Sequence, residues 1–132
     1  MSDYSRAWQV IVVGGGPAGS SAAWHLATAG LDVCLLDRAR FPRAKPCAEY
    51  VSPEASRILH AMGALAPLEQ GGAASLTGMV VHAPSGDRIH GEFVARHGFR
   101  GFRDRGLGVR REVLDTLLIE RARAAGVCVL ED

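Results

Sequence analysis

A short β-branched run, Val10–Val13, leads directly into a glycine-rich turn, and this junction constrains the fold more than any other segment. The turn covers Gly14–Gly19 and matches the pattern G-x-G-x-x-G. An alanine-rich stretch with helical character follows, and a second apolar run then ends in Leu36-Asp37. A strand, a tight glycine turn, a helix, a second strand and an acid about twenty residues further on form the layout of a dinucleotide-binding βαβ unit.

Each glycine of the turn has its own physical role in such a unit. Gly14 turns the chain sharply out of the strand, Gly16 leaves room for a diphosphate near the backbone, and Gly19 lets the helix lie close to the strand. Pro17 suits the first helical turn because the N–H that it lacks would be unpaired there. Free N–H groups at the start of a helix attract phosphate. The sequence therefore predicts a diphosphate site formed by Gly14, Gly15, Gly16, Pro17, Ala18 and Gly19.

The acid at the end of the second apolar run indicates which adenosine the unit prefers. The carboxylate of Asp37 is predicted to accept hydrogen bonds from an adenosine ribose, at roughly 1.5–3 kcal/mol for a charged bond. It would repel a 2′-phosphate, which disfavours an NADP-type adenosine, although Arg38 beside it weakens that repulsion. Arg38 is therefore kept with Asp37 as a candidate cofactor-binding residue. The motif itself does not separate FAD from NAD, because both contain the same ADP half.

Composition is that of an ordinary globular protein and argues against several function classes. The 132 residues favour a single domain, and a net charge of +1 gives no general case for binding to nucleic acid or membranes. No apolar run approaches the ~18 residues that span a bilayer, and no signal-peptide core is present, so we predict a cytoplasmic location. The cysteines lack C-x-x-C spacing and the histidines lack metal-site pairing, so neither a disulfide framework nor a metal site is predicted.

Periodicity and capping signals predict helices alternating with short strands. The predicted helices cover Pro17–Ala29, Ser52–Met62 and Arg111–Ala125. The predicted strands cover Val10–Val13, Asp32–Leu36, Thr77–Ala83, Arg88–Val94 and Val127–Leu130, with loops over 38–50, 66–76 and 96–110. This order predicts an α/β fold: a Rossmann-like βαβ unit over 8–37 with a parallel sheet, an inserted β-hairpin over 77–94, and a helix with a third parallel strand over 111–131.

Several of these segments together resemble a known group of flavoproteins. They are Val10–Gly19, Asp37-Arg38, Phe41–Cys47, the helix start Val51–Ala55, and Val109–Leu118, which is similar to V-x-R-x-x-[LF]-D-x-x-L. At these positions the chain resembles the FAD-dependent aromatic hydroxylase and geranylgeranyl reductase superfamily over nearly its whole length. NAD dehydrogenases lack the arginine-rich loop after the second strand and the later helix that starts with arginine, so the resemblance favours FAD.

The resemblance implies a glutathione-reductase-like FAD-binding domain with an inserted sheet, of which this chain would be the N-terminal portion, incomplete at its C-terminus. Gly14, Gly16 and Gly19 would hold the pyrophosphate of FAD, and Asp37 the adenosine ribose. Arg111 would contact the phosphate or ribityl region, the alternative being a solvated arginine at a helix end. The later Gly-Asp motif of the family is missing, so we expect the isolated chain to bind FAD weakly and to catalyse no reaction.

The loop around Cys47 is implied by the same resemblance to lie beside the flavin ring. The reductase branch usually has Cys-Gly-Gly here, whereas this chain reads Cys47-Ala48-Glu49, which predicts a backbone with less freedom. A loop cysteine that only packs against its surroundings is an equal alternative. No residue of the chain is assigned a catalytic role.

For the whole protein, the resemblance favours a monooxygenase that uses NAD(P)H and oxygen on a small apolar or aromatic substrate. Geranylgeranyl-reductase-like saturation of prenyl double bonds is the first alternative, and a non-catalytic nucleotide-binding module is the second. The oligomeric state is not specified by the sequence. Arginines at 96, 100, 103 and 105, interleaved with Phe99 and Phe102, leave contact with a polyanion as a minor alternative. Nucleic-acid binding is not expected, because no RNA-binding motif accompanies them.

Overall fold

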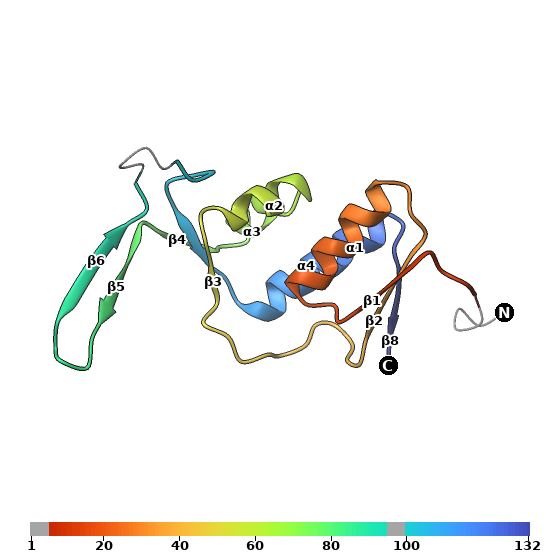
Figure 1. Cartoon of the computed structure of the whole chain (residues 1–132), viewed down its shortest axis with the longest axis horizontal. Coiled ribbons are helices and arrows are strands. Elements are labelled where there is room, and N and C mark those ends of the chain that lie inside the picture. Colours follow the sequence, from red (N-terminus) through yellow and green to blue (C-terminus); the bar gives the residue numbers. More distant parts are fainter. Residues whose placement is uncertain (1–5, 95–99) are drawn as a thin grey trace. The chain divides into compact units, whose positions relative to one another are not determined.

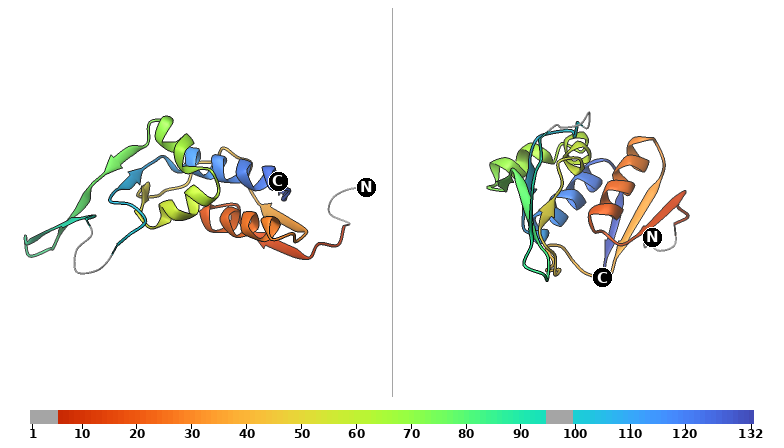
Figure 2. Two further views of the ribbon diagram at one scale, coloured as in Figure 1. Left: turned by 90° about the horizontal axis from the view of Figure 1, so that it is seen from above. Right: turned by 60° about the vertical axis from the view of Figure 1, so that its left-hand side comes forward.

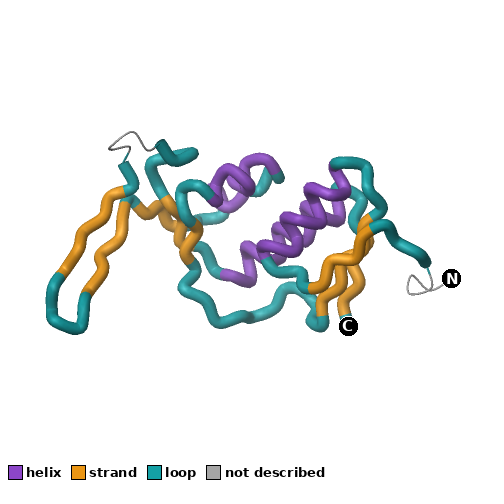
Figure 3. Tube along the Cα trace, in the orientation of Figure 1, coloured by secondary structure: helices purple, strands orange, loops and turns teal. Residues whose placement is uncertain are grey.

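The computed structural model describes residues 6–94 and 100–132, which divide into two compact units (Figure 1). Unit 1 comprises Met1–Lys45 and Arg111–Asp132, and unit 2 comprises Pro46–Arg110. Each unit contains both helices and strands, joined by loops that include the long segment 38–49 (Figure 3). The predicted α/β class, with a parallel sheet and an added hairpin, is confirmed.

Unit 1 is built on a parallel sheet of three strands. These are β1 (Val10–Val13), β2 (Val33–Asp37) and β8 (Cys128–Glu131), in the order β1-β2-β8. The strands are apolar along most of their length, as expected for parallel strands buried within an α/β fold. The parallel pairing of β8 with β2 confirms the predicted third strand.

Two helices cover one face of this sheet. Helix α1 (Pro17–Thr28) and helix α4 (Arg111–Ala124) pack against each other, and they lie side by side in every view (Figures 1 and 2). Small residues on α1 allow the close packing that the sequence predicts. The buried core between helices and sheet consists of Ala23, Val33, Leu35, Ile119, Ala122 and Val127.

The opposite face of the same sheet carries exposed apolar side chains. Side chains alternate along a strand, so Ile11 and Val13 point away from the helical face that Val10 and Val12 help to form. Ile11 is 55% exposed and Val13 is 81% exposed. The second covering layer expected for a parallel sheet is therefore not formed by the described residues of unit 1.

Unit 2 contains short helices and antiparallel strands. Its elements are β3 (Tyr50–Val51), α2 (Ala55–Ala61), α3 (Leu65–Gln70), β4 (Ala74–Leu76), β5 (Gly78–His82), β6 (Arg88–Glu92) and β7 (Gly106–Gly108). Strand β7 lies between β3 and β4 in one sheet, and β5 pairs with β6 in a separate hairpin. The turn of the hairpin, Pro84–Asp87, is the one predicted from its turn residues.

Two loop predictions in unit 2 are wrong. The segment 66–76 contains most of α3 and all of β4, and the segment 96–110 contains β7. Both strands have only three residues, and two of the three in β7 are glycine, so neither has an alternation that a sequence pattern would detect. Their strand conformation comes from pairing with each other.

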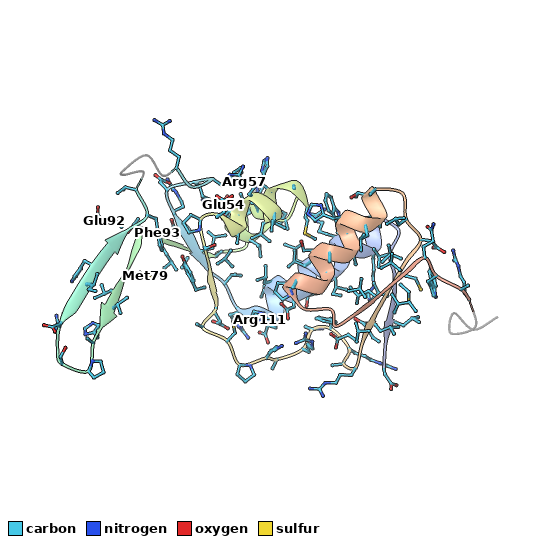
Figure 4. The ribbon with its side chains drawn as sticks, viewed as in Figure 1. Glu54, Arg57, Met79, Glu92, Phe93 and Arg111 are labelled. Atoms are coloured by element: carbon cyan, nitrogen blue, oxygen red, sulfur yellow. The ribbon has the colours of Figure 1, made fainter. Side chains whose placement is uncertain are left out.

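The start of α2 is held by local polar contacts. The backbone N–H of Ala55 donates to the Ser52 hydroxyl over 3.1 Å, although the helix begins at Ala55 and its N-cap residue is Glu54 and not Ser52. Glu54 accepts hydrogen bonds from Arg57 and from the backbone N–H of Phe102 (Figure 4). The bond from Arg57, and then that from Phe102, lowers the pKa of the Glu54 carboxyl.

The loop before β3 contains one residue in a conformation that favours glycine. Glu49 has a φ of +57°, and its carbonyl accepts a hydrogen bond from the backbone N–H of Val109 over 2.9 Å. A left-handed conformation at a non-glycine residue costs about 1–2 kcal/mol. The third residue of Cys47-Ala48-Glu49 is therefore strained, whereas a glycine would adopt the same conformation freely.

Of the helices in the part of the chain that the structure describes, none is both long enough and apolar enough to cross a membrane.

The junction between β1 and α1 can be tested by adding a single methyl group. A Cβ on Gly19 would lie 1.8 Å from the carbonyl oxygen of Gly14, and no side-chain rotation relieves a clash with backbone. Gly19→Ala is expected to lower the free energy of unfolding by about 3 kcal/mol in urea denaturation followed by circular dichroism.

Gly16→Ala is the matched control for that measurement. A methyl group on Gly16 would meet its nearest non-neighbouring atom at 3.6 Å, and φ at this residue is −71°. The control should change the free energy of unfolding by less than about 1 kcal/mol. Equal losses in the two variants would contradict the structure of this junction.

Candidate functional site

The glycine turn of unit 1 is fixed by backbone hydrogen bonds to the strand beside it. Gly14 has a φ of +100°, and its N–H donates to the carbonyl of Leu36 over 2.7 Å. Gly15 is buried, and a Cβ there would lie 2.8 Å from Ile119 Cδ1. The Ser20 hydroxyl donates to the Gly15 carbonyl over 2.9 Å. The turn therefore has one defined conformation, which places Gly16 at the start of α1.

The first turn of α1 contains no acidic side chain. Gly16 is the N-cap residue, and among the described residues no side chain caps the helix by a hydrogen bond. No acidic residue lies in the first turn, and Pro17 occupies its first position. The free N–H groups and the partial positive charge at this end are thus available to an external anion.

Two guanidinium groups lie beside Gly16. A methyl group on Gly16 would be 3.6 Å from Nη2 of Arg111 and 3.7 Å from Nη2 of Arg43. Arg111 begins α4 (Figure 4), and Arg43 lies in the loop after β2. The side chains of both arginines are mostly buried, with 14% and 16% of their surface exposed. The missing side chain of Gly16 therefore leaves space bordered by two cations and a helix N-terminus.

Two buried carboxylates hold these arginines. Asp115 is fully buried on α4, and it accepts hydrogen bonds from Nε and Nη2 of Arg111 over 2.8 and 3.0 Å. Nη1 of Arg43 lies 3.6 Å from Asp115, and its Nη2 lies 3.6 Å from Asp37. Nε of Arg43 is buried and lacks a hydrogen-bond partner among the described residues. Cations and anions thus alternate along the series Asp37, Arg43, Asp115 and Arg111.

The carboxylate of Asp37 also contacts the glycine turn. Its Oδ2 accepts a hydrogen bond from the backbone N–H of Gly15 over 2.7 Å, and its Oδ1 accepts one from Ala39 over 3.0 Å. A carboxylate has about four lone-pair sites, so these bonds leave acceptor capacity on both oxygens. The side chain is 7% exposed. Asp37 is therefore held at the turn and not directed elsewhere.

The structure brings together most of the residues predicted from the sequence. Gly14–Gly19, Asp37 and Arg111 lie within one small region of unit 1. Arg38 is exposed, so its assignment to the cofactor stays a prediction.

Sequence reasoning missed Arg43, Asp115 and Ser20 as members of this region. Asp115 follows Arg111 by four residues on a helix, a spacing typical of ion pairs, and this signal was available from the sequence. Arg43 lies in a loop, where no periodicity shows which way its side chain points.

Two arginines of the arginine-rich segment of unit 2 form ion pairs with acids. Arg96 and Phe99 lie outside the described residues. Arg103 forms an ion pair with Glu69, and Arg105 forms one with Asp104, whose pKa is lowered by the hydrogen bond from Arg105. The guanidinium of Arg57 lies over the ring of Phe102. The described arginines that form these pairs are therefore partly neutralised, and polyanion contact stays an untested alternative.

The chain matches a known family model over nearly its full length. The model for the FAD binding domain covers residues 7–132, which include the whole of the region described above.

Curated relatives extend the comparison to individual enzymes. The chain is 39% identical over 119 residues to geranylgeranyl diphosphate reductase of Rhodobacter capsulatus, covering 90% of this chain and 26% of that protein. It is 54% identical over 54 residues to menaquinone reductase of Mycobacterium tuberculosis, covering 41% of this chain and 13% of the relative. The chain thus spans about a quarter or less of the length of these relatives.

Solved structures give the same fold. The myxobacterial chondrochloren halogenase CndH matches with a TM-score of 0.80 and 28% identity, over 94% of this chain and 28% of that one. The flavin-dependent halogenase CmlS matches with a TM-score of 0.78 and 27% identity, over 96% and 23% of the two chains. Because the family model covers residues 7–132, the chain belongs to the FAD binding domain family.

Proposed function

We propose that unit 1 binds FAD with its diphosphate at Gly16, between the start of α1 and the guanidinium groups of Arg43 and Arg111. The observation that carries this proposal is the space left by the missing side chain of Gly16. A Cβ at that position would lie within 3.7 Å of both guanidinium groups. A diphosphate placed there would accept N–H bonds from the helix start and charged hydrogen bonds from the arginines. The Nε of Arg43, which has no hydrogen-bond partner within residues 6–94 and 100–132, also fits a ligand that carries hydrogen-bond acceptors.

Asp37 and Arg38 complete the proposed site on its adenosine side. The free acceptor sites of Asp37 would receive hydroxyl groups of the ribose, while its backbone-held position fixes where the ribose lies. Arg38, exposed beside it, would lie at the edge of the same nucleotide. When bound, the flavin ring of FAD supplies the hydride chemistry of the enzyme. The residues of unit 1 bind and orient the nucleotide end of the cofactor.

For the reaction, we propose a flavin-dependent oxidoreductase that reduces carbon–carbon double bonds of a prenyl chain. Geranylgeranyl diphosphate reductase and digeranylgeranylglycerophospholipid reductase 1 of Methanopyrus kandleri are 39% and 37% identical to the chain, each over 90% of its length. Both names describe a reductase whose substrate carries geranylgeranyl groups. The identity to the halogenase structures is lower, at 28% and 27%. This reverses the order of the sequence-based hypotheses, in which the monooxygenase came first.

The other parts of the functional prediction remain proposals. NAD(P)H is the proposed electron donor, a small molecule the proposed substrate and the cytoplasm the proposed location. The monooxygenase on an apolar or aromatic substrate is the second candidate, and the non-catalytic nucleotide-binding module is the third. All three candidate functions require the same nucleotide-binding site at Gly16. An experiment on the reaction is therefore needed to distinguish them.

The diphosphate position predicts the effect of Gly16→Ala on FAD binding. The added methyl group would occupy the space proposed for the phosphates, while it meets no protein atom outside its chain neighbours closer than 3.6 Å. The affinity for FAD, measured by quenching of flavin fluorescence, should fall at least about tenfold, or 1.4 kcal/mol, with folding retained. Unchanged affinity in this variant would place the diphosphate elsewhere.

The role of Arg43 predicts a loss of affinity on neutralising its side chain. Arg43→Gln removes one charged contact to the diphosphate, roughly 1.5–3 kcal/mol, so FAD should bind about 10- to 100-fold more weakly. Arg40→Gln, at an exposed arginine of the same loop, is the matched control and should leave the affinity within about twofold. Equal losses would show a general charge effect and not a contact at Gly16.

The reaction is tested by leaving oxygen out. With the full-length FAD-loaded protein, NADH or NADPH and a geranylgeranyl lipid under anaerobic conditions, mass spectrometry should detect product that has gained two hydrogen atoms per saturated bond. Oxygen uptake coupled to hydroxylation, with no anaerobic product, would favour the monooxygenase. Absence of flavin absorbance in the protein after FAD is added and unbound FAD is removed would favour the nucleotide-binding module.

A further inference from the structure

Asp115 is a fully buried carboxylate in a helix whose other buried residues are all apolar. Its neighbours on the buried face of α4 include Leu114, Leu118 and Ile119. A buried ion pair is weak evidence for stability, because well-packed apolar residues in its place are often as stable. Packing therefore does not explain an acid at this position, and its contacts must be considered.

The contacts of Asp115 are made by the two arginines beside Gly16. Arg111 donates Nε and Nη2 to the two carboxylate oxygens over 2.8 and 3.0 Å, which fixes the plane of its guanidinium. Arg43 approaches the same carboxylate with Nη1 at 3.6 Å. The two Nη2 groups that border the space at Gly16 thus belong to side chains held by one acid.

We propose that Asp115 is a positioning residue, which sets Arg43 and Arg111 at Gly16 before an anion binds and so makes the site selective for a diphosphate. An arginine side chain loses about 2 kcal/mol of rotamer entropy when it is fixed, and Asp115 imposes that loss during folding. Two guanidinium groups held in place match a ligand with two phosphates. This inference rests on the proposed function, because the diphosphate is the one proposed above for FAD.

Neutralising Asp115 distinguishes a positioning role from a simple electrostatic role, because the two roles predict opposite changes in the affinity for an anion. If Asp115 acted only as a nearby negative charge, Asp115→Asn would remove a repulsion and strengthen anion binding. If Asp115 positions the arginines, the same change weakens the binding of a diphosphate. A purely structural role would weaken the binding of every ligand of the site, whether or not it carries phosphate.

The experiment compares ADP with adenosine by calorimetry in the wild-type protein, Asp115→Asn and the control Glu120→Gln, at an exposed acid of the same helix. Asp115→Asn should bind ADP at least about tenfold more weakly and bind adenosine within about twofold of wild type. Glu120→Gln should match wild type for both ligands. Equal or tighter ADP binding by Asp115→Asn, or an equal loss for ADP and adenosine, would overturn the proposal.

A measurement on the wild-type protein covers the case in which Asp115→Asn does not fold. In nitrogen-15 NMR of the ligand-free protein, the Nε–H signal of Arg111 should be resolved and protected from solvent exchange, and should stay so when ADP is added. An Nε–H that exchanges freely until ADP binds would overturn the proposal. If the wild-type protein binds neither FAD nor ADP, the proposed function fails as well. If FAD binds normally but the Arg111 Nε–H exchanges freely with solvent, only the proposed role of Asp115 is contradicted.

Discussion

The structure of unit 1 depends on a close approach between two pieces of backbone. Gly19 passes the carbonyl oxygen of Gly14 so closely that a Cβ would lie 1.8 Å from it. This approach allows α1 to begin directly where β1 ends, so the unpaired N–H groups of the helix lie at the carboxyl edge of the parallel sheet. Asp37 ends the neighbouring strand at the same edge and bonds to Gly15. The missing side chain of Gly19 thus lets α1 begin close to the end of β1, and so close to Asp37.

Charge balance is the second condition that the site satisfies. Two cations beside Gly16 would repel each other if no anions accompanied them. Asp37 and Asp115 supply those anions, and both are almost completely buried. Arg43 joins the two acids through its two Nη groups, and it therefore connects the loop after β2 with α4. Residues that are far apart in the sequence are in this way brought together beside Gly16.

Much of this arrangement follows from the sequence, for identifiable physical reasons. The turn Gly14–Gly19 and the acid at Asp37 form a local motif, in which spacing along the chain determines spacing in the structure. The helix starting at Arg111 was predicted from its apolar periodicity, and the structure places it on the sheet as expected. These parts depend on contacts that are short in sequence or on strong periodic patterns.

The remaining parts depend on contacts that no local pattern encodes. Arg43 lies in an irregular loop, and its contact with Asp115 joins segments on two sides of unit 2 in the sequence. Strands β4 and β7 exist because they pair with each other, and their three-residue sequences do not favour strands strongly. Glu49 adopts its left-handed conformation against its own preference, while its carbonyl bonds to Val109. In each case tertiary contacts outweigh local propensity.

The most direct test of the central claim is a crystal structure of the protein with FAD bound. We expect density for the diphosphate at the start of α1, with oxygens within hydrogen-bond distance of the backbone N–H groups there and of both Arg43 and Arg111. We expect the adenosine ribose beside Asp37. A diphosphate bound away from Gly16, with neither arginine in contact, would contradict the account of this site.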